Sequence, residues 1–293
     1  MNEQKLVIKN VKSFNLKHIF ECGQCFRWNE NADGSYTGVV RENVININKF
    51  ENEIIVKSYG KEDLKTLFYD YFDMERDYEK IKSKLRKIDN NMEKSILYGE
   101  GIRLLNQDLW ETIISFIISA NNNIPRIKGI IERISKRFGN KIEWNGVEYY
   151  SFPTSSQLSK ASVEDLRNLG LGFRDVRVFE TTRIVANGEV DFNKMHLEKD
   201  TQKVREELLQ LPGVGPKVSD CILLFSTLKR LDVFPIDVWV RRVMNDLYIH
   251  NNDENKVDKK LVLNIADEKF GDLCGIAQQY LFYWKREEFK NVN

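Results

Sequence analysis

The sequence predicts an α+β protein, in which a small antiparallel β-rich N-terminal domain packs on a mostly helical region. Two observations lead to this prediction. Short runs of alternating apolar and polar residues occupy the stretch from 5 to 59, and helical periodicity replaces them after residue 60. We divide the chain into 1–105 and 106–293, and allow part of the N-terminal chain to pack with the helical region.

Five short runs predict the strands of the sheet. They are separated by polar segments, and NADG at 31–34 supplies a turn between two of them. The runs are KLVIKNV (5–11), CFRW (25–28), SYTGVV (35–40), NVININ (43–48) and EIIVKSY (53–59).

Helical periodicity covers most of the remaining chain. The stretch DLWETIISFIISA, 108–120, is apolar enough to form a buried core helix. Further helices are expected near 124–138, 162–169, 174–187, 200–210, 217–228, 237–248, 256–269 and 274–288.

Composition limits the class of protein. With 293 residues and 42% hydrophobic content, the chain can bury sizeable cores. It has no run of about 18 apolar residues, and its start lacks the apolar stretch of a signal peptide, so we expect a cytoplasmic protein. A net charge of +1 does not indicate a polyanionic partner, and any surface for nucleic acid must therefore be local.

One local candidate is the stretch 121–138, where cations outnumber the single acid Glu132. A charged helix face of this kind usually only contacts solvent, so the charge alone does not establish a binding surface. The cations are Arg126, Lys128, Arg133, Lys136 and Arg137.

The segment LPGVGPK, 211–217, joins two predicted helices by a tight turn. Its glycines let backbone N–H groups face outward, and such a loop binds phosphate. A Walker loop is excluded, because it needs GxxxxGK[ST] after a strand, whereas here Val218 follows the lysine and a helix precedes the loop. A helical hairpin that binds a backbone phosphate can hold DNA in register without reading its bases.

Lys217 lies in the first helical turn after this loop if Pro216 takes the first helical position. The helix dipole disfavours a cation there by about 0.3 to 1 kcal/mol, so a purely structural lysine gains nothing. The same field, with partial burial, favours the free amine, which is the form that attacks carbon and builds a Schiff base. A nucleophile and a plain phosphate contact both remain open.

Asp237 follows a proline-containing bend in VFPIDVWVRRV and precedes a predicted helix. This position is typical of a helix N-cap. A carboxylate beside a nucleophilic amine has a second use, because it guides protons and offsets positive charge that develops during a reaction. Both interpretations remain open.

Together, LPGVGPKVSDC and PIDVW closely resemble the helix-hairpin-helix, Gly/Pro-rich loop and aspartate signature of base-excision DNA glycosylases. A lysine at position 217 marks the bifunctional branch. Within that superfamily the chain resembles the 8-oxoguanine DNA glycosylase/lyases, because CGQCFRW, SANNNIPRI, LGLGFR and AQQYLF match in order over about residues 5 to 290. The resemblance implies a helix-hairpin-helix glycosylase core, with the active site in a cleft between the parts of the chain.

The resemblance also implies the chemistry. Lys217 would attack the sugar C1′ of a flipped nucleotide, displace the base and form a Schiff base from which the strand is nicked. Asp237 would be its electrostatic partner. The loop formed by Gly213, Val214 and Gly215 would hold the DNA backbone, in relatives often with a bound monovalent cation.

A base pocket follows from the same resemblance. Gly23 would offer its carbonyl to the N7 hydrogen of 8-oxoguanine, which guanine lacks, a difference of about 1 to 3 kcal/mol. Gln278 would read the Watson–Crick edge, and Phe282 and Cys221 would sandwich the ring. The spacing of these last two residues also suits an ordinary helical core.

Asn121, Arg126 and Arg174 match the residues that fill the gap left by the flipped base and grip the orphaned cytosine. The alternative is a polar helix end with two surface arginines. Phe173 stands where relatives carry a tyrosine wedge, and Trp239 where they carry a histidine that helps to hold a phosphate. A tryptophan N–H replaces one hydrogen bond but no charge.

His18, Cys22 and Cys25 raise the possibility of a metal site. A structural zinc needs a fourth ligand, and the sequence has no second CxxC or HxxxH. Some related glycosylases carry an iron-sulfur cluster near the C-terminus, but only Cys274 is available there. We expect no required cofactor, no zinc and no iron-sulfur cluster.

Three functions compete. They are a bifunctional 8-oxoguanine glycosylase/lyase, a monofunctional glycosylase for another damaged purine that uses Asp237 and water, and a noncatalytic DNA-binding module. Lys217 together with Gly23 and Gln278 favours the first. We expect a monomer that acts on double-stranded DNA containing 8-oxoguanine, enters no membrane, and lies at the nucleoid if the protein is bacterial.

Overall fold

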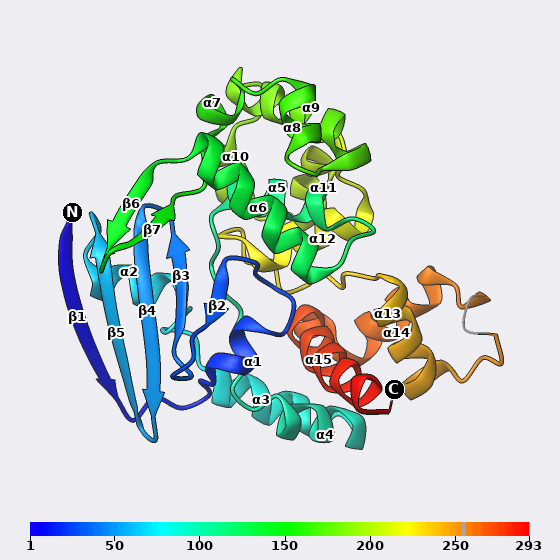
Figure 1. Ribbon diagram of the computed structural model, residues 1–293. Coiled ribbons are helices and arrows are strands. Elements are labelled where there is room, and N and C mark those ends of the chain that lie inside the picture. The colour runs from blue at the N-terminus through cyan, green and yellow to red at the C-terminus, as the bar shows by residue number, and fades with distance from the viewer. Residues whose placement is uncertain (254–255, 293) are drawn as a thin grey trace.

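The computed structural model describes residues 1–253 and 256–292, with side chains as far as residue 288. Five strands form one antiparallel sheet in the order β1-β5-β4-β3-β2, and the helical region packs beside it, which confirms the α+β class (Figure 1). The strands are β1 (Asn2–Lys9), β2 (Trp28–Glu30), β3 (Tyr36–Val40), β4 (Asn43–Phe50) and β5 (Glu53–Gly60).

Helices make up most of the remainder, and none among the described residues is long and apolar enough to cross a membrane. The first, α1 (Leu16–Phe20), lies between β1 and β2. The others are α2 (Leu64–Tyr71), α3 (Tyr78–Arg86), α4 (Asn90–Tyr98), α5 (Leu109–Ser119), α6 (Ile124–Phe138), α7 (Ser155–Leu158), α8 (Val163–Asn168), α9 (Asp175–Ala186), α10 (Phe192–Leu197), α11 (Thr201–Leu209), α12 (Pro216–Phe225), α13 (Val238–Met244), α14 (Lys259–Phe270) and α15 (Cys274–Val292).

The predicted strand at CFRW is wrong except for its last residue. The structure has bends before Trp28, where β2 begins. Phe26 packs in the helical core, whereas Cys25 and Trp28 pack in the sheet core. The segment therefore bridges two cores and cannot present one face to a sheet.

Uninterrupted helical structure after residue 60 is also wrong at one place. A hairpin of β6 (Lys141–Trp144) and β7 (Val147–Tyr150) extends from the helical region toward the sheet (Figure 1). Asn145 and Gly146 form its turn with φ of +52° and +74°, as the Asn-Gly sequence requires. Ile142 and Trp144 pack against Val39 and Val44 of the sheet.

The buried apolar residues form two large clusters. The sheet cluster is aromatic, with Phe20 stacked on Trp28 at 4.2 Å between ring centroids. The helical cluster centres on α5 and α12, which contact each other. Neighbours in the sequence point into different clusters, Leu104 into the helical one and Leu105 into that of the sheet. The predicted division at residue 105 stays a prediction.

Two polar side chains fix the segment that crosses between the clusters. Lys229 donates from Nζ to the carbonyls of Leu104 and Leu105 at 3.1 and 2.6 Å, and burial lowers its pKa to about 7. Gln24, which is fully buried, donates to the carbonyl of Arg103 and accepts from the amide of Leu105. The loop before Gln24 is therefore held against the crossing segment.

Glu111 lies in the first turn of α5, whose N-cap is Asp108. Burial raises the pKa of this carboxyl to about 7, although Arg27, with Nη1 3.9 Å from Glu111 Oε2, opposes the shift. The folded pKa exceeds the unfolded value of 4.5. The folded state therefore binds the proton more tightly, and stability is lost as pH rises between these two values.

We predict that Glu111→Gln becomes more stable relative to the wild type as pH rises from about 5 to about 8, by about 1 to 3 kcal/mol, because glutamine has no charge to bury. Urea unfolding of both proteins at the two pH values measures the difference. A stability difference that stays constant with pH would contradict the prediction.

Candidate active site

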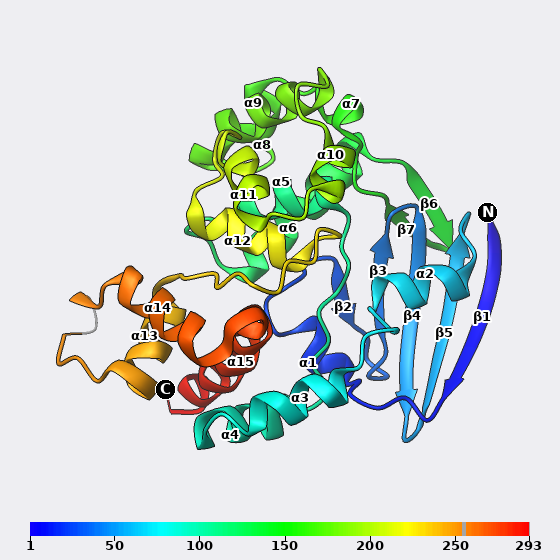
Figure 2. The same cartoon turned by 180° about the vertical axis from the view of Figure 1, so that it is seen from behind.

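A cleft of about 560 Å³ lies where the end of α5 meets the starts of α12, α13 and α14. Figure 2 shows α12 in yellow, with α13 and α14 in orange beside α15 in red. The cleft brings together four residues that the sequence had singled out, Asn121, Lys217, Asp237 and Trp239. It is also lined by Arg241 and Lys259, which the sequence analysis had not selected.

The loop between α11 and α12 opens its backbone toward solvent. Gly213 has φ +87°, and a Cβ there would lie 3.0 Å from the side chain of Ile117, so glycine is required on both grounds. The amide of Val214 bonds the carbonyl of Leu211 at 3.0 Å. No described residue accepts a hydrogen bond from the amides of Gly213 or Gly215. This leaves two N–H groups at the positive end of α12 free to bind an anion.

Lys217 is the second residue of α12, because Pro216 takes the first position and Gly215 the N-cap. Its side chain is half-buried, and Nζ lies 5.4 Å from the centroid of the Phe116 ring. Cys221, one turn further along α12, is buried, which raises the pKa of its thiol to about 11 although Lys217 opposes the shift. Cys221 is therefore a neutral thiol at neutral pH and places no negative charge beside the lysine.

Asp237 is the N-cap of α13, and its Oδ1 accepts a hydrogen bond from the amide of Val240 at 2.8 Å. The capping interpretation of this residue is therefore correct. The same half-buried carboxylate also lines the cleft that contains Lys217. Capping fixes the carboxylate in place, and its position in the cleft leaves it able to act on the lysine's chemistry.

A second group of residues lies where α15 meets the loop before β2. A Cβ on Gly23, which has φ +87°, would lie 3.5 Å from Cε1 of Phe282. Gln278 is 5% exposed, and among the described residues none forms a hydrogen bond with its Oε1. A buried unpaired amide oxygen costs about 1 to 3 kcal/mol, so the structure leaves a polar group here that a ligand can satisfy.

The residues predicted to face the opposite strand lie in the loop after α5, in the first turn of α6 and in the turn before α9. Asn121 is exposed, with φ +50°, and lines the cleft. Arg126 is exposed, with Nη2 3.3 Å from the carbonyl oxygen of Gly170. Phe173 is 56% exposed, an unusual state for a large apolar ring. All three are accessible to a partner.

Arg174 differs from these three, because it is 1% exposed. Nη2 donates to the carbonyls of Ala120 and Asn121 at 2.6 and 2.7 Å, and Nη1 donates to that of Leu171 at 3.2 Å. Its guanidinium also lies 4.2 Å from the centroid of the Phe173 ring. Arg174 therefore holds the loop that presents Asn121, and the description of a surface arginine does not fit it.

The three residues considered for zinc have other partners. The Sγ atoms of Cys22 and Cys25 lie 3.3 and 3.7 Å from the carbonyls of Ile19 and Phe20, and burial raises the pKa of both thiols. Nδ1 of His18 accepts from the amide of Gly101 at 3.2 Å. Within the described ranges no group of three or more His, Cys, Asp or Glu side chains could hold a metal ion.

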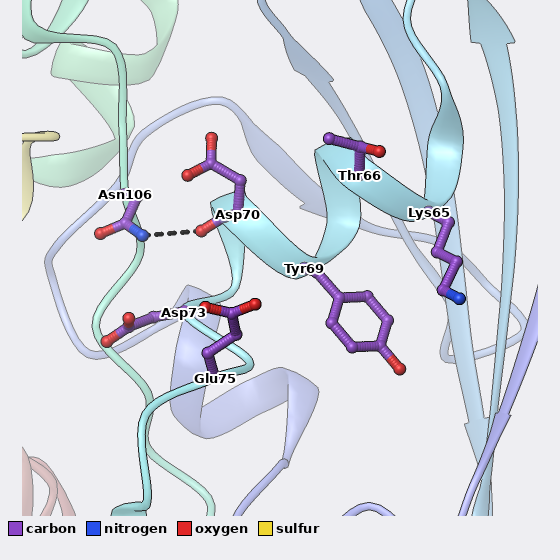
Figure 3. Close-up of a pocket in the computed structure, with 7 residues that line it drawn as sticks. All are labelled: Lys65, Thr66, Tyr69, Asp70, Asp73, Glu75 and Asn106. Atoms are coloured by element: carbon purple, nitrogen blue, oxygen red, sulfur yellow. Dashed lines mark hydrogen bonds between the residues drawn. The ribbon is translucent and has the colours of Figure 1, made fainter.

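Another hollow, of about 510 Å³, lies beside α2. Figure 3 shows the carboxylates of Asp70, Asp73 and Glu75 around it, with the Asn106 amide bonded to the carbonyl of Asp70. Asp70 and Asp73 are paired with Arg41 and Arg76, so these arginines are already engaged. Lys65 is the one cation among the described residues that line the hollow. The cleft that contains Lys217 is therefore the better candidate for binding nucleic acid.

Comparison with known proteins agrees with this arrangement. Residues 6–113 match the family 8-oxoguanine DNA glycosylase, N-terminal domain, and residues 114–266 match the HhH-GPD superfamily base excision DNA repair protein. The crystal structure of the Clostridium acetobutylicum 8-oxoguanine glycosylase/lyase with DNA has a TM-score of 0.92 and 40% identity, and the match covers 98% of each chain. The N-glycosylase/DNA lyase of Saccharomyces cerevisiae is 33% identical over 95% of this chain and 85% of its own length.

The chain therefore belongs to the HhH-GPD superfamily of base excision DNA repair proteins. A probable N-glycosylase/DNA lyase of Methanothermobacter thermautotrophicus is also 33% identical, over 72% of this chain and 71% of its own length. The resemblance inferred from the sequence, to bifunctional enzymes of the 8-oxoguanine glycosylase/lyase type, is confirmed.

We predict that Arg174→Met lowers the free energy of unfolding by about 2 to 4 kcal/mol, because it leaves the carbonyls of Ala120, Asn121 and Leu171 without their charged donor. Arg126→Met is the matched control, since Arg126 is exposed, and should change stability by less than about 0.5 kcal/mol. Urea denaturation measures both variants. Equal losses would show that Arg174 does not hold this loop.

Proposed function

We propose that this protein removes 8-oxoguanine from double-stranded DNA and then nicks the strand, with Lys217 as nucleophile. The observation that carries the proposal is the position of Lys217 and Asp237 in one cleft, at the mouth of a hairpin loop with free N–H groups. The resemblance to 8-oxoguanine glycosylase/lyases supports the choice of substrate.

In this mechanism the neutral amine of Lys217 attacks C1′ of a flipped nucleotide. The bond from C1′ to the base breaks, the base leaves with its electron pair and a proton, and opening of the sugar gives a protonated Schiff base. Loss of a C2′ proton then expels the 3′ phosphate. Asp237 offsets the positive charge at C1′ and guides the protons.

Selection of the base depends on Gly23 and α15. The Gly23 carbonyl accepts the N7 hydrogen that only the oxidised base carries, and the unpaired Oε1 of buried Gln278 accepts from the Watson–Crick edge. Phe282 covers one face of the ring, and the neutral thiol of Cys221 covers the other.

On the opposite strand, we assign the contacts to three accessible residues, which lie after α5, in the first turn of α6 and in the turn before α9. Asn121 fills the gap, Phe173 wedges between bases and Arg126 grips the orphaned cytosine. Arg174 contributes mainly by fixing the loop, because its guanidinium bonds three backbone carbonyls. Discrimination for cytosine then depends on one exposed arginine, Arg126, rather than on two.

Phosphate binding is assigned to Gly213, Val214 and Gly215, with Trp239 donating one hydrogen bond. No described residue bonds the carbonyl oxygens of Gly213 and Val214, so these oxygens fit a monovalent cation at the loop. Lys259 lines the same cleft, so it supplies a positive charge near Trp239, which replaces the histidine of relatives. The protein would act as a monomer at DNA, because one flipped nucleotide needs one pocket.

The proposal predicts a covalent adduct when borohydride is added with a duplex that carries one 8-oxoguanine opposite cytosine. Lys217→Ala should abolish the adduct, because no amine remains to form the Schiff base that borohydride reduces. A guanine duplex is the control substrate.

Other results distinguish the rival functions. In one such result the wild type releases the base without forming an adduct, and Lys217→Ala keeps this activity. That result would make the enzyme monofunctional, with water activated by Asp237 as the nucleophile. Binding with no chemistry on any lesion would leave a DNA-binding module and overturn the enzyme mechanism proposed here.

We also predict that Lys259→Gln reduces the magnitude of the negative slope of log affinity against log salt by about 0.9, the value for one lost phosphate contact. Lys260→Gln is the matched control, because it removes the same charge from the next residue of α14, which does not line the cleft. Fluorescence anisotropy in a Lys217→Ala background, where the DNA stays uncut, measures both slopes. Identical slopes would remove Lys259 from the phosphate contacts.

A further inference from the structure

Three neighbouring carbonyls in the loop before β2 are occupied, and one is not. The carbonyl of Glu21 accepts from Nη2 of Arg286, that of Cys22 from Nε2 of Gln279, and that of Gln24 from Nε2 of Gln107. No described residue donates to the carbonyl of Gly23. Among residues 21–24, the Gly23 carbonyl is therefore the one left for a ligand, and the chain is bonded on both sides of it.

Two of these donors come from α15, the helix that also carries Gln278 and Phe282. Gln279 is 2% exposed, and the Arg286 side chain is 12% exposed, so water does not compete strongly for either bond. Both bonds join parts of the chain far apart in sequence, with 257 positions between Gln279 and Cys22. They set the distance between the Gly23 loop and α15.

Arg286 touches the wall of the pocket as well as the loop. Its guanidinium carbon lies 5.3 Å from the centroid of the Phe282 ring. A Cβ placed on Gly23 would lie 3.4 Å from Nη1 of Arg286 and 3.5 Å from Phe282. Gly23, Phe282 and Arg286 therefore form one contact group, in which movement of the arginine changes the position of the other two.

We propose that Gln279 and Arg286 are positioning residues that fix the Gly23 carbonyl relative to Gln278 and Phe282, and thereby set selectivity for a base with a hydrogen at N7. This inference rests on the proposed function. A hydrogen bond weakens steeply with distance and angle, so a loop that shifts by about an ångström loses the contact that distinguishes the oxidised base. Lys217 and Asp237 lie on other elements and take part in neither bond, and the packing of α15 against α13, which Asp237 caps, does not require either of them.

The test compares base release with strand cleavage at a preformed abasic site, which needs no base pocket. Gln279→Met keeps the size of the side chain and removes the donor, and Arg286→Met keeps the apolar stem and removes the guanidinium with its donors. We expect single-turnover release of 8-oxoguanine to fall roughly 5- to 30-fold, as for loss of one buried hydrogen bond. Cleavage of the abasic duplex should stay within about twofold of the wild type, because the lysine and its hairpin are intact.

Two further variants separate positioning from general stability. Arg286→Lys keeps a donor and should recover part of the base-release rate. Lys285→Met removes the adjacent cation, whose ion pairs with Asp246 and Glu288 involve neither Gly23 nor Phe282, and should leave both activities unchanged.

Parallel loss of base release and abasic cleavage in Gln279→Met and Arg286→Met would indicate only a structural role and overturn the inference. Unchanged base release in both variants would also overturn it. If the wild-type protein releases no 8-oxoguanine, both the proposed substrate and this inference are overturned. This outcome is seen with the wild type alone, before any variant is compared.

Discussion

The structure depends on the segment 103–105, where the chain passes from the sheet cluster to the helical cluster. Gln24 bonds the carbonyl of Arg103 and the amide of Leu105, and Lys229 bonds the carbonyls of Leu104 and Leu105. Each bond satisfies a polar group that water cannot reach, so breaking one carries the full desolvation penalty. Both the loop that carries Gly23 and the loop that follows α12 are thereby hydrogen-bonded to the same short stretch of backbone.

Helix α12 combines two physical demands. Its apolar side packs against α5 in the helical cluster, while its N-terminus presents unpaired amides and Lys217 to the cleft. Pro216 suits this arrangement, because it begins the helix without needing an acceptor. Asp237 begins α13 in a different way. Its carboxylate accepts a hydrogen bond from the amide of Val240, and this bond holds the carboxylate at the cleft. Helix ends thus supply both the electrostatics and the geometry of the site.

Much of this arrangement could be predicted from the sequence, because local patterns determine it. Helical periodicity placed α6 at its observed bounds, and the Gly-Val-Gly-Pro loop predicted the turn before Lys217. Long-range packing could not be predicted, as at CFRW, where neighbouring residues enter different cores. The β6–β7 hairpin was missed although Asn145-Gly146 signalled it, since the surrounding helical pattern dominated the interpretation.

The solvent exposure of individual polar side chains also could not be predicted from the sequence. Arg174 looked like a surface cation, yet the carbonyls of Ala120 and Asn121 surround its guanidinium. Gln279 lies within AQQYLF and Arg286 lies outside any motif, but no role could be predicted for either, because their partners are backbone carbonyls, which every residue has. The position of Lys259 in the cleft could not be predicted, because it depends on where α14 begins relative to α13, a relation between distant segments.

The bond between Gln279 and Cys22 closes a loop that spans nearly the whole chain. Contacts of such separation form late in folding, since both clusters must assemble before they can be made. Loss of this one bond would loosen the Gly23 loop without undoing the packing of α15 against α13, whose N-cap is Asp237. In the function proposed here, recognition of the lesion is therefore less robust than strand cleavage, because it depends on single long-range hydrogen bonds rather than on a whole contact between helices.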